Sequence, residues 1–362
     1  MDEKLPLPAA VGDRSEPPAA APVLSGAAVR AAALDCRFTL VGLARAQALD
    51  AAPLERWLAA GYAADMDWMG RRMPERLDPT RVLEGAATVI ALAIAYRRPA
   101  EERARSVVAS YARGRDYHYA HRDRMKSLRK RLLALEPDLE TYACVDTGLA
   151  MEKAWAERAG LGWIGKNGCL INPALGSSLT LSVMFVDRAV DAYDRPHANR
   201  CGDCALCLRA CPTQAFPAPG VVDARRCISY QSIENRAQVP IALRRGFRGR
   251  VFGCDVCQEV CPYNQNQEIP AGDPKFAPRP IGLLAPAALA ALSREDFERL
   301  SAGTALARAQ YDGLRRNALL ALGAARDPDA RPLLERLTVD PSPIVREAAA
   351  WALGRIAGPP GL

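Results

Sequence analysis

Eight of the eleven cysteines fall between residues 201 and 261, in a pattern that is typical of iron-sulfur ligands. The first group has the form Cys-x2-Cys-x2-Cys-x3-Cys-Pro, and the second has the form Cys-x2-Cys-x3-Cys-Pro with Cys227 supplying a fourth thiol. A [4Fe-4S] cluster needs four thiolates, and in the bacterial ferredoxin pattern the cysteine before proline ligates the other cluster. The spacing therefore predicts two interlocked ligand sets: Cys201, Cys204, Cys207 and Cys261 for one cluster, and Cys211, Cys227, Cys254 and Cys257 for the other.

Two other uses of cysteine fit this pattern less well. Structural zinc is held by paired Cys-x2-Cys knuckles, but it needs neither a third cysteine at the same spacing nor the Cys-Pro signature. Disulfides form in oxidising compartments, and the Pro- and Ala-rich N-terminus does not resemble a secretory signal. Cys36, Cys144 and Cys169 are isolated among apolar residues, so we expect them to be small buried hydrophobic residues.

The remaining chain shows no equally clear chemical motif. It has no Gly-x-Gly-x-x-Gly loop before the cysteines, and its three histidines lack metal-site spacing, so His118 and His121 are expected to cap a helix or face solvent. The net charge of +7 permits an anionic partner. Basic residues concentrate in Tyr111 to Arg131, where a solvated helix face is expected, and in Arg244 to Arg250, where a function is favoured because a cysteine motif follows.

The elements that position the cysteines are a mixed domain before them and helices after them. The run TVIALAIAY at 88–96 predicts a strand buried on both faces, with further strands at 141–145, 169–172 and 179–186 and helices at 27–60, 111–135 and 151–159. These elements do not alternate as strand-helix-strand units, which favours an antiparallel or mixed sheet over a doubly wound parallel one. The longest apolar run is far shorter than the roughly 20 residues of a membrane-spanning helix.

The C-terminal part repeats itself. RRNALLALG at 315–323 recurs as REAAAWALG at 346–354, which predicts a short HEAT-like helical array that either docks on the preceding domains or serves as a stabilising cap. The predicted organisation is a disordered tail (1–24), an α+β domain (25–190), a ferredoxin-type module (191–270) and a linker with HEAT-like repeats (271–362).

Eight motifs between about residues 60 and 265 resemble those of epoxyqueuosine reductases, in the order of that family. They are MDWM (66–69), YARGRDYH (111–118), VDTG (145–148), EKAWAERAGLGWIGKN (152–167), LINP (170–173), GS (176–177), CISY (227–230) and GCDVCQ (253–258). The resemblance implies a nitroreductase-like α+β domain that binds cobalamin, two [4Fe-4S] clusters, and reduction of epoxyqueuosine to queuosine in the tRNA anticodon loop.

The resemblance also assigns roles to residues. Asp146 of the VDTG motif is the implied proton donor, on the hypothesis that a buried site keeps its carboxyl group protonated; the alternative from local sequence is a helix N-cap. Removing the epoxide oxygen as water needs two electrons and two protons. The implied cobalamin contacts are Met69, Ser110, Tyr111, Asp146, Leu170, Leu181, Met184 and Ser229.

The expected partners are a tRNA anticodon stem-loop and an unidentified electron donor. The candidate phosphate contacts are Arg244, Arg245, Arg248, Arg250, Arg315, Arg316 and Arg346. No membrane association is expected, and the chain is predicted to act as a cytoplasmic monomer. Two alternatives stay open: a reductive dehalogenase-like corrinoid enzyme, and a non-catalytic electron-transfer subunit.

Overall fold

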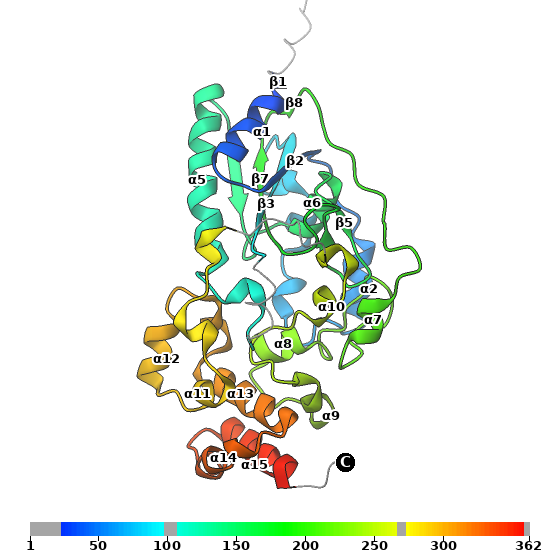
Figure 1. The fold of residues 1–362 in the computed structure, drawn as a ribbon. Coiled ribbons are helices and arrows are strands. Elements are labelled where there is room, and N and C mark those ends of the chain that lie inside the picture. The colour runs from blue at the N-terminus through cyan, green and yellow to red at the C-terminus, as the bar shows by residue number, and fades with distance from the viewer. Residues whose placement is uncertain (1–22, 98–106, 266–272, 358–362) are drawn as a thin grey trace, which may run out of the picture.

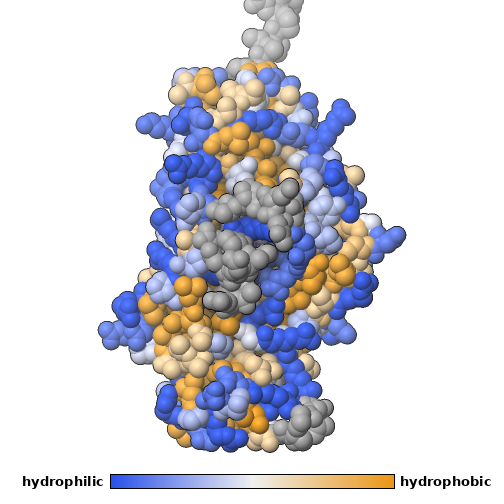
Figure 2. Space-filling model, in the orientation of Figure 1, coloured by the Kyte–Doolittle hydropathy of each residue, from blue (hydrophilic) through white to orange (hydrophobic). Residues whose placement is uncertain are grey.

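The computed structural model describes residues 23–97, 107–265 and 273–357. The molecule is elongated, with the sheet at one end, the cysteine-rich segment beside and below it, and the C-terminal helices at the other end (Figure 1). Hydrophilic side chains border the hydrophobic patches on the face drawn in Figure 2. Within the described ranges no helix has the length and hydropathy needed to cross a bilayer.

The expected N-terminal tail lies almost wholly outside the described residues. Its last two positions, β1 (Val23–Leu24), pair in parallel with β8 (Ala189–Val190). This pairing joins the beginning of the first domain to its end.

A four-stranded antiparallel sheet forms the centre of the first domain, as the order of elements predicted. Its strand order is β2 (Leu40–Arg45), β3 (Thr88–Ala95), β7 (Leu179–Val186) and β4 (Thr141–Cys144). Every residue of β3 is buried, which explains why its sequence is a continuous apolar run without alternation.

Helices cover both faces of this sheet. On one face α1 (Gly26–Asp35) and α5 (Tyr117–Leu135) pack on Ile90, Leu92 and Ile94. On the other face α6 (Glu152–Arg158) buries Trp155 against Val89, Ala91 and Phe185. Shorter elements complete the domain: α2 (Ala52–Ala59), η1 (Asp67–Met69), α3 (Met73–Leu77), η2 (Pro79–Arg81), η3 (Ser110–Ala112), β5 (Trp163–Ile164) and β6 (Leu170–Ile171).

The cysteine-rich segment folds as short helices joined by tight loops. They are α7 (Leu206–Ala210), α8 (Ile228–Ile233), α9 (Ile241–Arg244), η4 (Arg245–Phe247), α10 (Val256–Glu259) and η5 (Pro262–Asn264). Helices α7 and α10, which carry cysteines of the two groups, contact each other.

The C-terminal part is a helical array that packs on the cysteine-rich segment. Its elements are η6 (Pro274–Phe276), η7 (Pro280–Leu283), α11 (Pro286–Ala290), α12 (Arg294–Ser301), η8 (Ala305–Ala309), α13 (Tyr311–Ala325), η9 (Pro328–Ala330), α14 (Arg331–Leu337) and α15 (Pro343–Ala357). Phe247 and Phe252 share one core with Leu314 and Leu319 of α13. The array therefore docks on its neighbour.

Candidate functional site

A cavity of about 460 Å³ opens between the sheet domain and the cysteine-rich segment. Its lining is made of methionine and leucine side chains, tyrosines and several charged or polar groups: Met69, Arg76, Tyr96, Tyr111, Tyr117, Asp146, Glu152, Lys153, Cys169, Leu170, Leu179, Thr180, Leu181 and Gln258 are among its members. Five residues predicted to contact the cofactor thus meet at this cavity: Met69, Tyr111, Asp146, Leu170 and Leu181.

Three other predicted contacts lie outside this lining. Met184 is completely buried in the core beneath α1 and α5, so the structure corrects that prediction. Leu181 and Met184 are three residues apart on β7, and successive side chains of a strand point to opposite faces, so both cannot face the cavity. Ser110 donates its backbone N–H to Asp255 at 2.7 Å, and Ser229 accepts a hydrogen bond from Ser232 at 3.2 Å.

The loop after β4 carries Asp146 to the edge of the cavity. Asp146 has φ +56°, in the left-handed region that few non-glycine residues adopt, and its N–H donates to a carboxylate oxygen of Glu152 at 2.7 Å. Gly148 lies so close to Cys144 that an added Cβ would be 2.1 Å from the cysteine Cβ. The N-cap of α6 is Met151, so Asp146 does not cap that helix.

His118 lies between two carboxylates at this site. Its Nδ1 is 2.7 Å from Oδ1 of Asp116, and its Nε2 is 3.4 Å from Oδ2 of Asp146. Burial alone would disfavour the imidazolium, but the hydrogen bond to Asp116 and the nearby carboxylate of Asp146 outweigh it and raise the pKa of His118 to about 9. The hydrogen bond with His118 lowers the pKa of Asp146.

This geometry does not fit the hypothesis that a buried site keeps Asp146 protonated. The Asp146 side chain is 60% exposed, His118 lowers its pKa, and the raised pKa of His118 favours the imidazolium at neutral pH. Sequence analysis expected only a capping or solvent-facing role for His118. The available signal was the Asp-x-His spacing at the start of α5, where Asp116 caps the helix by accepting the His118 N–H at 2.9 Å.

The tyrosines at the cavity stay neutral. Burial raises the pKa of both Tyr111 and Tyr117, so their hydroxyl groups can donate hydrogen bonds at any physiological pH. Tyr117 also stacks on His118, with ring centroids 4.3 Å apart. His121, one turn further along α5, is fully buried between the hydroxyl groups of Thr180 and Ser182, where burial lowers its pKa to about 3.

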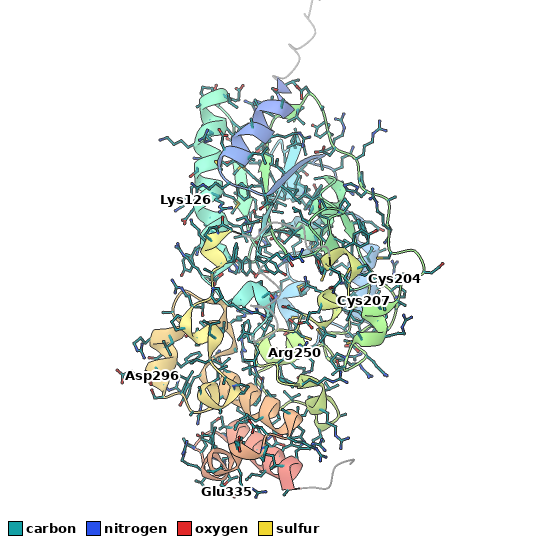
Figure 3. The ribbon with its side chains drawn as sticks, viewed as in Figure 1. Lys126, Cys204, Cys207, Arg250, Asp296 and Glu335 are labelled. Atoms are coloured by element: carbon teal, nitrogen blue, oxygen red, sulfur yellow. The ribbon has the colours of Figure 1, made fainter. Side chains whose placement is uncertain are left out.

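The first predicted cluster set comes together near the surface. Cys201, Cys204, Cys207 and Cys261 all line one cavity of about 260 Å³. Cys204 is exposed, and Figure 3 shows Cys204 and Cys207 towards the outer edge of the molecule. The Nε1 of Trp163 lies 3.5 Å from the sulfur of Cys201.

The second set lies on the side of the larger cavity. Burial raises the pKa of the Cys227 and Cys254 thiols, and the nearby thiols of Cys211 and Cys227, respectively, add to these shifts. Cys169 and Gln258, which follows Cys257, line the larger cavity. Cys257 therefore lies beside that cavity.

Three of the seven arginines predicted to contact phosphate are buried and serve the fold. Arg244 pairs with Glu347 at 2.7 Å, and Arg315 pairs with Asp340 at 2.5 Å. Arg316 is 1% exposed and donates to backbone carbonyl groups of the cysteine-rich segment, including that of Gln231 at 2.8 Å. These three predictions are wrong, because the guanidinium groups are already used inside the protein.

The other four arginines are accessible to different degrees. Arg245 and Arg248 are exposed. Arg250 pairs with Glu259 at 2.9 Å, and the exposed Arg346 donates to the carbonyl oxygen of Asp340 at 2.7 Å. Arg245 and Arg248 thus keep the best access to an outside phosphate.

Comparisons with known proteins agree with this architecture. Family models described as "4Fe-4S double cluster binding domain", "Epoxyqueuosine reductase QueG, DUF1730" and "HEAT repeats" match residues 200–264, 76–147 and 301–362. An epoxyqueuosine reductase of Gloeobacter violaceus is 46% identical over 84% of this chain and 97% of its own length. One of Pseudomonas aeruginosa is 41% identical, covering 84% of this chain and 86% of the relative.

Solved structures of epoxyqueuosine reductases have a similar fold. A crystal structure of epoxyqueuosine reductase with an epoxyqueuosine-modified tRNA-Tyr stem loop is 30% identical with a TM-score of 0.83, covering 91% of this chain and 89% of that one. A Bacillus subtilis epoxyqueuosine reductase, whose catalytic aspartate loop is swung out of the active site, is 30% identical with a TM-score of 0.81. It covers 91% of this chain and 90% of its own.

Proposed function

The chain belongs to the epoxyqueuosine reductase family, and from that premise we propose that it reduces epoxyqueuosine to queuosine in the anticodon loop of tRNA. One observation carries the proposal: Asp146, which contacts His118, and Gln258, which directly follows Cys257 of the second cysteine set, line the same cavity. Electrons and protons can therefore be delivered to one bound substrate. The epoxyqueuosine-modified tRNA stem loop in the solved structure of a relative supports the choice of substrate.

The positions of the two cysteine sets support one direction of electron flow. The chain carries a 4Fe-4S double cluster domain, and the exposed Cys204 belongs to the set near the surface. We propose that the electron donor, which is not identified, docks beside this set. The set containing Cys257 would then pass electrons towards the cavity, one at a time.

The cavity suits cobalamin as the group that receives these electrons. Met69, Leu170 and Leu181 offer apolar surface for a corrin ring, while Lys153 and Gln258 offer partners for its amide side chains. When bound, cobalamin supplies the reducing nucleophile that opens the epoxide. The nitroreductase-like classification of this domain is part of the same proposal, and the helix-covered antiparallel sheet supports it.

Asp116, His118 and Asp146 supply and hold the proton. Reduction of the epoxide to an alkene and water consumes two electrons and two protons, and the epoxide oxygen becomes basic as its bond to carbon breaks. The imidazolium of His118 stores one proton 3.4 Å from Asp146, and the exposed carboxylate of Asp146 can carry it to the substrate; the second proton comes from solvent by the same route after His118 is protonated again. Asp146 remains the residue that contacts substrate, and His118 acts through it.

The experiment is an anaerobic turnover assay. Protein reconstituted with iron, sulfide and cobalamin is mixed with a strong reductant and tRNA containing epoxyqueuosine, and the digested nucleosides are identified by mass spectrometry. We expect cobalamin-dependent loss of one oxygen atom, a fall of about 10²-fold or more for Asp146→Asn, and no change for the distant Asp296→Asn.

Each alternative has its own outcome in this assay. No conversion, with both clusters formed and corrinoid bound, would favour a dehalogenase-like enzyme. Failure to bind any corrinoid would favour an electron-transfer subunit. Full turnover by Asp146→Asn would remove the proposed role of that residue.

A further inference from the structure

Trp68 and Arg308 form an exposed stacked pair near the rim of the cavity. Trp68 lies in η1 directly before Met69, which lines the cavity, and the indole is 37% exposed. The guanidinium carbon of Arg308, in η8, lies 5.5 Å from the centroid of the indole, and the Arg308 side chain is 55% exposed. Arg308 is also close enough to Asp146 to stabilise its carboxylate.

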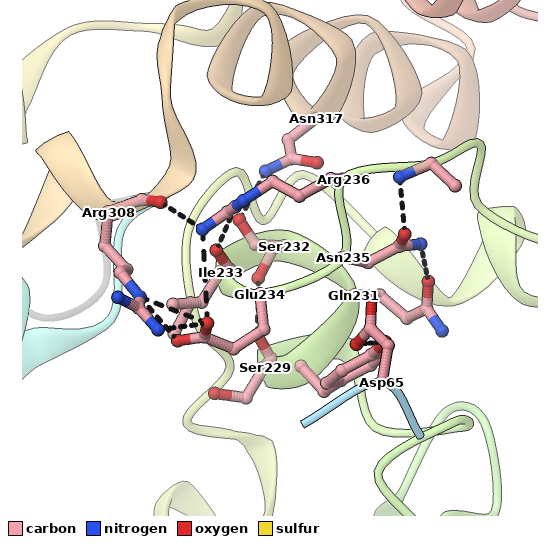
Figure 4. Close-up of polar contacts among 12 residues, drawn as sticks. Asp65, Ser229, Gln231, Ser232, Ile233, Glu234, Asn235, Arg236, Arg308 and Asn317 are labelled. Atoms are coloured by element: carbon pink, nitrogen blue, oxygen red, sulfur yellow. Dashed lines mark hydrogen bonds and ion pairs between the residues drawn. The ribbon is translucent and has the colours of Figure 1, made fainter. Parts of the chain in front are cut away.

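A fixed network orients the guanidinium plane of Arg308. Nε and Nη2 of Arg308 donate to the two carboxylate oxygens of Glu234 at 3.0 and 2.8 Å (Figure 4). Arg236 donates from Nη2 to the carbonyl oxygen of Arg308 at 2.7 Å and pairs with the same Glu234. A bidentate pair of this kind fixes the edges of the guanidinium and leaves its flat faces available.

The segment that carries Trp68 is anchored to the cysteine-rich segment. The hydroxyl group of Tyr230 donates to Asp65, three residues before Trp68. The Nε1 of Trp57 donates to the carbonyl oxygen of Val222 at 2.7 Å, and the N–H of Ala224 donates to Tyr62 at 3.0 Å. Three distant parts of the chain therefore build one preorganised aromatic and cationic surface.

Resting on the function proposed above, we propose that the Trp68–Arg308 pair is a stacking platform for an unpaired nucleobase of the anticodon loop, next to the base that is reduced. Unpaired bases of RNA loops are recognised by stacking on aromatic rings and arginine planes. Two of the five N–H groups of Arg308 serve Glu234 and fix the guanidinium plane, and a phosphate contact by the other three is the alternative that Arg308→Lys tests.

Binding of a fluorescently labelled anticodon stem-loop tests the platform without turnover. We expect Trp68→Ala to weaken binding by about tenfold and Trp68→Phe to retain most of it, since one stacked base contributes about 1 to 3 kcal/mol. Arg308→Lys keeps the positive charge but loses the flat guanidinium group and its bidentate hydrogen bonds to Glu234. This variant should therefore also bind the stem-loop more weakly. Arg294→Lys is the matched control, because Arg294 lies 4.6 Å over the ring of Tyr311 and outside the platform.

Stem-loops with one abasic nucleotide on either side of the modified position identify the base. For the stacked nucleotide, the losses of binding free energy caused by the abasic substitution and by Trp68→Ala should not be additive, because both changes remove the same contact. Full additivity at both positions, or unchanged affinity of Trp68→Ala with normal cluster absorbance, would overturn the platform. Unchanged affinity of Arg308→Lys would show a charge contact instead and would also overturn it. A wild-type protein that binds no stem-loop would overturn the proposed function as well.

Discussion

Replacing Asp116 with Asn should shift the alkaline limit of activity to lower pH. The pKa of His118 is about 9, roughly 2.5 pH units above its ordinary value of about 6.5. Asp116 is the nearer of the two carboxylates, at 2.7 Å against 3.4 Å for Asp146. We therefore expect Asp116→Asn to lose more than half of the rise and bring the pKa of His118 to about 7.5.

The consequence for turnover follows from the fraction of His118 that is protonated. At pH 8.5 most of the wild-type imidazole carries a proton, whereas at a pKa of about 7.5 only about one tenth would. The rate of Asp116→Asn at that pH should fall several-fold, while its rate at pH 6.5 stays near the wild-type rate. Asn also caps helices well, so the start of α5 should persist.

The free energy of unfolding should also change with pH as His118 titrates. Because folding raises the pKa of His118, the imidazolium stabilises the fold fully below pH 6.5, and this contribution is lost as pH rises through 9. The side chain is only 22% exposed, so the wild-type protein should lose up to about 3 kcal/mol over that range and Asp116→Asn less than half as much.

The measurements are kcat/KM by mass spectrometry and thermal unfolding, each from pH 6 to 10. Asp327→Asn is the matched control, since Asp327 also caps a helix but has no histidine beside it. An alkaline limit that stays near pH 9 in Asp116→Asn, or that survives in His118→Gln, would refute the assignment of the proton to His118.

Three further outcomes are expected. Gly148→Ala should reduce turnover at least tenfold with unchanged cluster absorbance, because an added methyl group would collide with Cys144 and displace the catalytic loop. Arg245→Glu combined with Arg248→Glu should weaken stem-loop binding and flatten its dependence on salt concentration, as titrations at several ionic strengths would show. Arg316→Ala should instead lower the unfolding temperature, with a loss of about 3 kcal/mol or more, because it removes buried hydrogen bonds to carbonyl groups.

The order of modules and the type of chemistry could be predicted from local patterns in the sequence. Cysteine spacing is a local property, and it predicted the set of Cys201, Cys204, Cys207 and Cys261 that one cavity gathers. The continuous apolar run of β3 and the repeat in α13 and α15 are also local patterns, and they predicted a buried central strand and a helical array.

Folding decides which charged side chains are exposed to a partner and which residues from distant segments contact each other. Arg245 and Arg316 are the same residue type in similarly basic stretches. Arg245 is exposed, whereas Arg316 is enclosed by backbone carbonyl groups from a segment about 80 residues away in the sequence. Asp116, which is local, gives the larger part of the rise in the pKa of His118, but Asp146, which adds to it, is brought close only by folding, as is Arg308 beside Trp68. Burial and pairing depend on long-range packing, so no local pattern of residue types encodes them.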